Sequence, residues 1–240
     1  MNTPRMRMFA GPNGSGKSTL NGIISKQLLG IYINPDEIEK QVKVHGTLNL
    51  SDYQINTNKI ELMLFFKEHT LIKNVNLSDE IVKLDFFENT IDFSQLTINS
   101  YYASVCADFI RHQLLKEKIS FTFETVMSSH DKVQFLKKAQ EAGYRTYLYF
   151  IATQDPIVNI SRVKNRVSLG GHNVPEDKII NRYYRSLELL KEAVKYSTRA
   201  YIFDNSSREK LWIAQIDGGK NFIFKNEFVP QWINKYLLQQ

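Results

Sequence analysis

Short apolar runs alternate along this 240-residue chain with longer segments in which apolar residues recur every three or four positions. The apolar runs are Met6 to Ala10, Ile31 to Ile33, Ile119 to Phe123, Thr146 to Ala152 and Tyr201 to Phe203. Runs of this kind are typical of strands buried on both faces, and the longer segments are typical of helices. The alternation predicts an α/β fold with an open, mainly parallel sheet and helices on both of its faces.

Polar caps and glycines mark where the predicted helices begin and end. Asp155 followed by Pro156 is a typical helix start, and Gly30 and Gly143 follow the ends of two helical segments. We expect helices over residues 17–29, from about 37, over 51–69, 100–118, 129–143 and 156–169, from about 176, and over 228–238. A single domain of this fold is expected over residues 1–240.

Residues 70–100 depart from this alternation. Apolar residues there come in short groups separated by Asn and Asp, a pattern that favours short strands in a hairpin or meander. We interpret the segment as a small insertion in the fold. A second hairpin is predicted near the end of the chain, where Leu211 to Ile216 and Asn221 to Phe224 flank the turn Asp217-Gly218-Gly219-Lys220.

Composition limits the classes of protein to be considered. The chain has 42% hydrophobic residues and a net charge of +6, which suits a folded domain that binds an anionic ligand. The basic residues are scattered, so nucleic-acid binding is not favoured. Cys106 is the only cysteine, which excludes an intrachain disulfide, and the sequence lacks the stretch of about 18 apolar residues typical of a membrane span. A soluble, cytoplasmic protein is expected.

A complete G-x-x-x-x-G-K-[ST] motif follows the first apolar run. Its residues are Gly11, Pro12, Asn13, Gly14, Ser15, Gly16, Lys17, Ser18 and Thr19. In a phosphate-binding loop of this kind, Gly11 and Gly16 let the backbone approach the phosphates, Lys17 contacts the β- and γ-phosphates, and Ser18 can ligate Mg²⁺. The sequence therefore predicts a site for ATP or GTP with Mg²⁺, and the rest of the chain should supply a phosphate acceptor.

Two acidic residues stand at the ends of predicted strands, where open α/β sheets bind ligands. Asp36 follows Ile31 to Ile33, and we favour its role as general base for an acceptor hydroxyl over its alternative role as a helix N-cap. Glu124 stands before Thr125 and is expected to reach Mg²⁺, directly or through water, or to hold the acceptor. The alternative for Glu124 is an ordinary charge that faces solvent.

Arginines recur on two predicted helices in the second half of the chain. Arg162 and Arg166 lie four positions apart on one face, and Arg182 and Arg185 follow on the next helix. The Gly170-Gly171 hinge between these helices is typical of a lid that closes over a nucleotide and neutralises the transferring phosphoryl group. A solvated helix face with Glu–Arg pairs is the alternative.

Two further polar positions are candidates for ligand contact. His172, beside the two glycines, either contacts substrate or caps the turn, and the second role is slightly favoured. Asn205 lies in the polar turn after Tyr201 to Phe203, which we expect to sit near the nucleotide base.

With these stretches in view, the chain resembles the zeta-toxin-like family of P-loop kinases, in particular its branch of ATPases related to zeta toxins. The stretches that carry the resemblance are residues 11–19, Asn34-Pro35-Asp36, Phe121-Thr122-Phe123-Glu124-Thr125, Arg162-Val163-Lys164-Asn165-Arg166-Val167, Gly170-Gly171-His172-Asn173-Val174-Pro175 and Arg182-Tyr183-Tyr184-Arg185-Ser186-Leu187. They span most of residues 5–205. The stretches around the lid are the specific ones, because a phosphate loop alone would not identify the family.

The resemblance implies a kinase that uses ATP or GTP to phosphorylate a hydroxyl of a small molecule, with UDP-N-acetylglucosamine or another nucleotide sugar as the acceptor. It gives the role of base to Asp36, the role of the third-strand glutamate to Glu124, and phosphate contacts to Arg162 and Arg166. Thr125 and Ser128, close to Glu124, are further candidates for contact with the acceptor. Zeta toxins carry an arginine where this chain has Ser128, so the sugar-nucleotide contact is expected to differ. Toxins of the family are held inactive by small antitoxins, which makes an antitoxin an expected partner.

Two other classes of function stay open beside a small-molecule kinase. A nucleotide-dependent switch or partner-binding ATPase would use the insertion to dock a protein and would phosphorylate no acceptor. A polynucleotide-end kinase would need a groove of Lys and Arg with stacking aromatic residues. The even spread of charge along the chain disfavours that third class.

Overall fold

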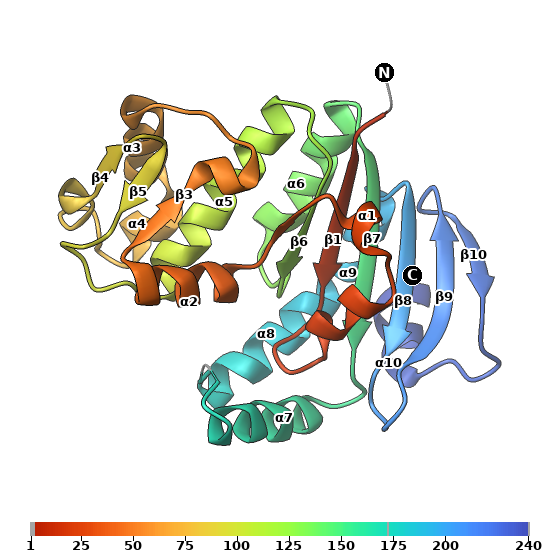
Figure 1. Ribbon diagram of the computed structural model, residues 1–240. Coiled ribbons are helices and arrows are strands. Elements are labelled where there is room, and N and C mark those ends of the chain that lie inside the picture. The colour runs from red at the N-terminus through yellow and green to blue at the C-terminus, as the bar shows by residue number, and fades with distance from the viewer. Residues whose placement is uncertain (1–2, 172, 240) are drawn as a thin grey trace. The chain divides into compact units, whose positions relative to one another are not determined.

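The computed structural model describes residues 3–171 and 173–239 of the chain (Figure 1). Within this described part, the backbone divides into two compact units. Unit 1 comprises the residues up to 30 and those from 122 onward, and unit 2 comprises residues 31–121. The insertion predicted at residues 70–100 lies inside unit 2, together with the segments predicted as helices before and after it.

The described residues form a seven-stranded, mainly parallel sheet in the order β10-β9-β8-β7-β1-β6-β2 (Figure 1). Its strands are β1 (Arg5–Ala10), β2 (Ile31–Ile33), β6 (Phe121–Thr125), β7 (Arg145–Ala152), β8 (Arg199–Asp204), β9 (Leu211–Asp217) and β10 (Asn221–Phe224). β1 pairs in parallel with β7, and β7 with β8, whereas β8 with β9 and β9 with β10 are antiparallel. The predicted α/β class and the predicted hairpin near the end of the chain are confirmed.

The central strands of unit 1 are buried because their apolar runs fill both faces of the sheet. Met6, Met8 and Phe9 of β1 are fully buried. Phe9 packs edge-on against Tyr149 of β7 with 5.3 Å between ring centroids, and Tyr149 stacks on Tyr201 of β8 at 4.6 Å. Aromatic contacts of this kind help to fix the register between neighbouring strands. Because β1, β7 and β8 run in parallel, the loops that follow them emerge at one edge of the sheet.

Short and long helices connect the strands of unit 1. They are the 3₁₀ helix η1 (Lys17–Gly22), α1 (Lys26–Leu29), α6 (His130–Glu141), α7 (Pro156–Ser168), α8 (Glu176–Glu188), α9 (Leu190–Lys195), α10 (Gln231–Ile233) and the π-helix η4 (Asn234–Leu238). α7 starts as predicted, because Asp155 accepts a hydrogen bond from the Ile157 N–H at 2.7 Å and Pro156 follows it. In the part of the chain that is described, none of the helices has the length and apolar content needed to cross a membrane.

Two helices of unit 1 differ from their predictions. The helix predicted over residues 17–29 is instead a 3₁₀ helix that ends at Gly22 and a separate single turn that begins after Ser25. Ser25 has an extended backbone, and serine and glycine favour such breaks because both have low helix propensity. The helix predicted over 228–238 begins only after Pro230, because the residues before a proline avoid helical conformations.

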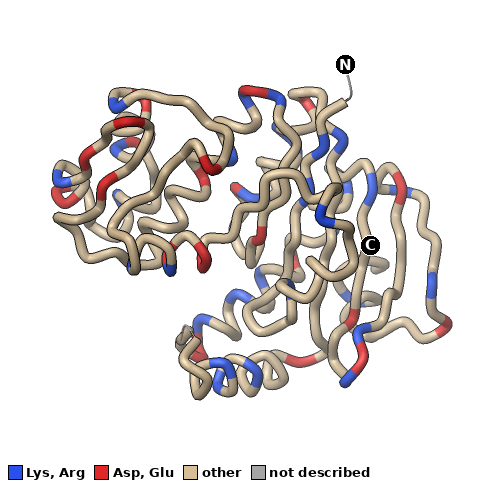
Figure 2. The backbone as a smooth tube through the Cα atoms, viewed as in Figure 1, with Lys and Arg blue, Asp and Glu red and all other residues tan. Residues whose placement is uncertain are grey.

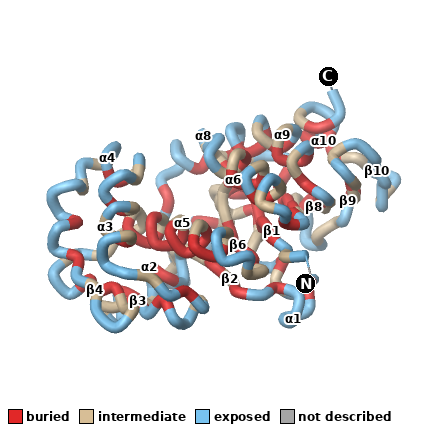
Figure 3. Tube along the Cα trace, turned by 90° about the horizontal axis from the view of Figure 1, so that it is seen from above, coloured by how far each residue is buried: buried red, intermediate tan, exposed pale blue. Residues whose placement is uncertain are grey.

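Unit 2, all of whose residues are described, combines helices with a three-stranded antiparallel sheet in the order β3-β5-β4. Its further elements are α2 (Pro35–His45), β3 (Thr47–Asn49), the 3₁₀ helix η2 (Leu50–Tyr53), α3 (Lys59–Glu68), α4 (Thr70–Asn74), the 3₁₀ helix η3 (Ile81–Lys83), β4 (Asp85–Phe87), β5 (Thr90–Asp92) and α5 (Ser100–Lys116). α5 is buried along much of its length and packs against α2, α3 and α4 (Figure 3). Cys106 lies in α5 and is fully buried, and burial raises the pKa of its thiol.

The helix predicted over residues 51–69 starts later than expected. α3 begins at Lys59, where the Asn58 side chain accepts a hydrogen bond from the Glu61 N–H at 2.9 Å. Ser51 lies instead in η2, where its N–H donates to the Asn49 side chain at 2.8 Å. Asparagine is a strong N-cap, and the two asparagines therefore start two separate helices, η2 and α3.

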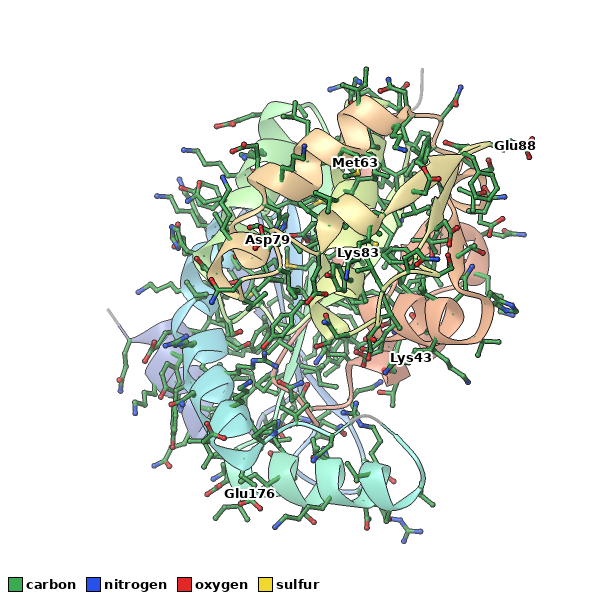
Figure 4. The ribbon with its side chains drawn as sticks, turned by 90° about the vertical axis from the view of Figure 1, so that its left-hand side faces the viewer. Lys43, Met63, Asp79, Lys83, Glu88 and Glu176 are labelled. Atoms are coloured by element: carbon green, nitrogen blue, oxygen red, sulfur yellow. The ribbon has the colours of Figure 1, made fainter. Side chains whose placement is uncertain are left out.

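The strands predicted within residues 70–100 are confirmed in part. β4 and β5 form an antiparallel pair joined by the two residues Glu88 and Asn89 (Glu88 is labelled in Figure 4). Both residues have positive φ, which gives this tight hairpin the twist that matches its strands. Residues 70–74 form the helix α4 rather than a strand, and the partner of β5 on its other side is β3, from outside the predicted segment.

Candidate functional site

The predicted phosphate loop connects β1 to η1 and requires glycine at Gly11 and Gly16. Both have positive φ, of 147° and 97°. A Cβ atom at Gly11 would lie 2.0 Å from the Ile151 carbonyl oxygen, and one at Gly16 would lie 2.5 Å from the Asn205 side-chain nitrogen. Either substitution would therefore strain the backbone and collide with the element behind the loop. The local geometry agrees with the role that the sequence predicts for these two residues.

The Lys17 side chain folds back over the loop from which it comes. Its ammonium donates hydrogen bonds to the Gly11 carbonyl oxygen at 2.9 Å and to the Pro12 carbonyl oxygen at 3.0 Å. Ser18 and Thr19 follow it and are exposed. The ammonium therefore lies at the mouth of the loop, where a phosphate group would compete with the two carbonyl oxygens for its protons.

Two asparagine side chains brace the loop from outside. Asn159, fully buried in the first turns of α7, donates from Nδ2 to the Asn13 carbonyl oxygen at 2.5 Å. Asn205 follows β8 and donates from Nδ2 to the Ser15 carbonyl oxygen at 2.8 Å. The Thr153 hydroxyl donates to Oδ1 of Asn159 and so orients its amide. Because both braces end on carbonyl oxygens, they occupy none of the loop N–H groups that cradle a phosphate.

Buried polar atoms without a partner gather around the same loop. Among the described residues, the Asn13 side-chain oxygen, the Ser15 hydroxyl and Nη1 of Arg162 are buried and form no hydrogen bond. Nearly all buried polar atoms in proteins are paired, so such a group of unpaired atoms calls for an explanation. Two of these atoms belong to the loop itself, and the third belongs to the first predicted lid arginine.

Two cations besides Lys17 lie around the loop. Arg162 of α7 donates from Nη2 to the Ser207 carbonyl oxygen at 3.3 Å. Lys210 donates to the Thr19 hydroxyl at 3.1 Å and to the Thr19 carbonyl oxygen at 3.3 Å, and burial lowers the pKa of its ammonium. Positive charge therefore reaches the loop from α7 and from the segment after β8, which suits an anionic ligand.

The two helices predicted to form a lid are α7 and α8. They pack through a small apolar cluster of Val163, Val174 and Ile179, and the Lys164 ammonium pairs with the Glu176 carboxylate at 2.6 Å (Glu176 is labelled in Figure 4). Basic residues recur along α7 in Figure 2, among them Arg166, which is exposed one turn after Arg162. Closure of these helices over a nucleotide stays a prediction. His172 lies outside the described residues.

At the end of β6, Glu124 is buried, with 8% of its surface exposed, and Thr125 and Ser128 are half-buried. The Thr125 hydroxyl accepts a hydrogen bond from the Met127 N–H at 3.1 Å, and the Ser186 hydroxyl of α8 donates to the Val126 carbonyl oxygen at 2.8 Å. The burial of Glu124 differs from that of an ordinary solvent-facing charge. The segment after β6 is thus attached to the second lid helix within unit 1.

Asp36 belongs to unit 2, whereas the phosphate loop belongs to unit 1. It is the second residue of α2 and is exposed. The N-cap of α2 is Asn34, whose side chain accepts from the Asp36 N–H at 2.9 Å, so Asp36 does not fill the capping role weighed as its alternative. Its role as a general base stays a prediction.

The predicted Mg²⁺ ligands Ser18 and Glu124 both offer oxygen donors. Mg²⁺ is commonly held by one or two protein oxygens together with phosphate oxygens and water. Within residues 3–171 and 173–239, no group of three or more His, Cys, Asp or Glu residues is arranged to hold a metal ion. The oxygen donors of Ser18 and Glu124 fit the chemistry of Mg²⁺, and their role as its ligands stays a prediction.

The sequence did not indicate three residues that support the loop. Thr153 and Asn159 carry no motif, and Asn159 differs from its neighbours on α7 only as a polar residue beside the apolar stripe of Ile160 and Val163. Lys210 is one lysine among many scattered along the chain. Each of these residues supports the loop through a contact between segments that are far apart in sequence. Such contacts cannot be predicted from the local sequence pattern.

A mainly parallel sheet with a phosphate loop after β1 and an arginine-bearing helix after β7 places the chain in the class of P-loop kinase-like folds. The model of the Zeta toxin family matches residues 98–217, which are half of the chain. The chain therefore belongs to the Zeta toxin family.

Other comparisons cover more of the chain than the family model does. An uncharacterised protein of Haemophilus influenzae is 26% identical over 175 residues, which are 73% of this chain and 89% of that protein. A chain of the AvrRxo1-ORF1:-ORF2 complex, crystallised with ATP, has a TM-score of 0.53 and 14% identity, and the match covers 93% of this chain and 61% of that chain. A chain of the PezAT chromosomal toxin-antitoxin system of Streptococcus pneumoniae has a TM-score of 0.50 and 16% identity over 88% of this chain and 71% of that chain. This chain thus spans about three fifths of the AvrRxo1 chain, and the two solved structures share its fold.

Proposed function

We propose that this protein is a phosphotransferase that moves the terminal phosphoryl group of ATP or GTP to a hydroxyl group of a small molecule. The observation that carries the proposal is the phosphate loop, with its required glycines, the Lys17 ammonium at its mouth and unpaired buried polar atoms around it. Membership of the Zeta toxin family supports it. Nucleotide sugars, UDP-N-acetylglucosamine among them, are the acceptors to test first, and a small antitoxin is the proposed protein partner.

In the proposed reaction, the acceptor oxygen attacks the γ-phosphorus in line with the bond to the bridging oxygen. A new oxygen–phosphorus bond forms, the bond between the bridging oxygen and the γ-phosphorus breaks, and the nucleoside diphosphate leaves. Lys17 and the arginines Arg162 and Arg166 stabilise the charge that develops on the transferring group. Asp36 accepts the hydroxyl proton and later returns it to solvent.

The remaining predicted residues have supporting roles in this proposal. Ser18 and Glu124 would hold Mg²⁺, which supplies charge neutralisation between the phosphates when it is bound. Thr125, Ser128 and the loops after β6 would contact the acceptor. Asn205 would keep its hydrogen bond to the Ser15 carbonyl oxygen, and the residues beside it in the turn after β8 would approach the nucleotide base.

The test is incubation of the purified protein with labelled ATP or GTP and a panel of nucleotide sugars, followed by mass spectrometry of the products. We expect one acceptor to gain a phosphate, and Lys17→Ala to lose both nucleotide binding and transfer. Lys220→Ala, in the exposed turn between β9 and β10, is the matched control because it removes a lysine far from the loop in the fold. Nucleotide hydrolysis without any phosphorylated product would favour the switch class instead, and absence of nucleotide binding by the unaltered protein would overturn the proposal.

A further inference from the structure

Unit 1 contains a cavity of about 490 Å³ that is separate from the residues of the phosphate site. Three segments line it. They are residues 154–156 at the start of α7, residues 183–184 of α8, and residues of the C-terminal helices between 231 and 239. The lining includes no residue of the phosphate loop and none of the predicted site residues. Its volume lies within the range typical of small-molecule sites.

Two buried aromatic rings form the inner wall of this cavity. Trp232 and Tyr183 are only 3% and 2% exposed. Their polar ends are already occupied, because Nε1 of Trp232 donates to the Asp204 carboxylate at 2.7 Å and the Tyr183 hydroxyl donates to the Thr153 carbonyl oxygen at 2.6 Å. These two side chains therefore form a closed inner wall and offer a ligand neither a free hydrogen-bonding group nor an exposed ring face.

A third ring, Tyr184, stands edge-on to Tyr183 with 5.3 Å between centroids and an angle of 89° between the ring planes. Tyr184 is 43% exposed, so a flat ligand can reach it from solvent. Because the rings of Tyr183 and Tyr184 are perpendicular, a flat ligand ring can stack on Tyr184 alone. An exposed aromatic ring of this kind is a common platform for a nucleobase.

Amide side chains surround the outer part of the cavity. Gln154, Gln231 and Asn234 line it, are exposed, and form no side-chain hydrogen bond with any of the described residues. Each offers both a donor and an acceptor, the combination that pairs with the edge of a nucleobase. Lys235 also lines the cavity, and its ammonium lies 4.9 Å from the centroid of the Tyr236 ring. This ammonium is a point charge available to a phosphate group.

We propose that this cavity binds a second nucleobase-bearing molecule, a nucleoside or nucleoside monophosphate. The base stacks on the exposed ring of Tyr184, with Trp232 and Tyr183 as the inner wall of the cavity, the amides contact its edge, and Lys235 takes the phosphate. The proposal goes beyond the phosphotransfer function and does not depend on it, because none of these residues has a part in that reaction.

The test uses adenosine, guanosine, cytidine and uridine with their 5′-monophosphates as probes, in calorimetry with the full chain carrying Lys17→Ala. That background disables the phosphate loop, so any remaining binding occurs elsewhere. We expect at least one base to bind, Tyr184→Ala to weaken that binding by about tenfold through loss of stacking, and Lys235→Ala to weaken the monophosphate but not the nucleoside. Trp232 fluorescence, recorded with Trp212→Phe so that only one tryptophan reports, should change on binding.

Tyr184 and Lys235 are both exposed, so neither change should unfold the chain, and circular dichroism checks this. Lys220→Ala in the same background is the control and should leave binding unaltered. No binding of any probe at millimolar concentration would overturn the proposal, as would binding that is indifferent to both Tyr184→Ala and Lys235→Ala. Titration of the unaltered chain with ATP reports separately on the phosphate loop, so failure of the two proposals can be told apart.

Discussion

At the scale of single residues, the phosphate loop depends on side chains that its motif does not contain. The motif itself could be predicted from sequence, because each of its residue types has a local reason to be there. The hydrogen bond from Asn159 to the Asn13 carbonyl oxygen could not be predicted, because the two residues are 146 positions apart. The same contact gives α7 a direct connection to the loop, so the position of this helix and the shape of the loop should depend on one another.

Asn159→Asp tests this connection with a minimal change in size. The carboxylate can still accept from the Thr153 hydroxyl, but it cannot donate to the Asn13 carbonyl oxygen and places negative charge against it. We expect ATP affinity in calorimetry to fall by about tenfold or more, in line with the roughly 1–3 kcal/mol that a buried group costs when it loses its partner. Asn165→Asp, on the exposed side of the same helix, is the control for added charge. Equal affinity in both variants would show that the brace is unimportant for binding.

At the scale of elements, predictions succeeded where the start of an element has its own chemical signal. Asp155 with Pro156 predicted the start of α7, and two glycines between apolar runs predicted the hairpin of β9 and β10. The predictions were wrong where an apolar pattern continues across the boundary between two helices. Residues 51–69 hold apolar positions throughout, yet Asn58 begins a separate helix, because an N-cap side chain outweighs the modest helix propensity of the residues before it.

The pairing of α7 with α8 gives a prediction at this scale. Ile179, 1% exposed, packs with Val163 and Val174 between the helices, whereas its neighbour Ile180 is 37% exposed. Ile179→Ala should lower the free energy of unfolding by about 2–5 kcal/mol, because it removes buried methyl groups and leaves a cavity. Ile180→Ala should change it by less than about 0.5 kcal/mol. Urea denaturation of the two variants measures the difference, and similar losses for both would contradict the packing described here.

At the scale of the whole molecule, alternating strands and helices were enough to predict the α/β class and the parallel centre of the sheet. The extent of unit 2 was not predictable in the same way, because its small sheet joins Thr47 to Asp92, and no local pattern links residues so distant in sequence. The proposed base, Asp36, belongs to this unit, and the phosphate loop belongs to the other.

Tyrosines in both units have raised pKa values, and these determine how the stability of the whole chain should change at high pH. Desolvation of the half-buried Tyr53 phenol, followed by electrostatic interactions with Cys106, Asp52 and Glu37, raises the pKa of Tyr53 from 10.0 to about 12. Burial also raises the pKa of four further tyrosines, which are Tyr102, Tyr144, Tyr149 and Tyr183. A raised pKa in the folded state means that the neutral phenol is favoured there, so the stability it contributes is fully present below the unfolded pKa near 10 and is lost as the pH rises toward the folded value.

The free energy of unfolding, measured with urea, should therefore be insensitive to these groups below about pH 9 and should fall above about pH 10. In ultraviolet absorbance, the tyrosines with a raised pKa should ionise only as circular dichroism is lost. Tyr53→Phe, which removes one ionisable group from unit 2 and keeps its ring, should make the fall in stability with pH shallower. Ionisation of all the tyrosines in one step near pH 10, with circular dichroism unchanged, would mean that water reaches these phenols in the folded chain and that their burial does not hold in solution.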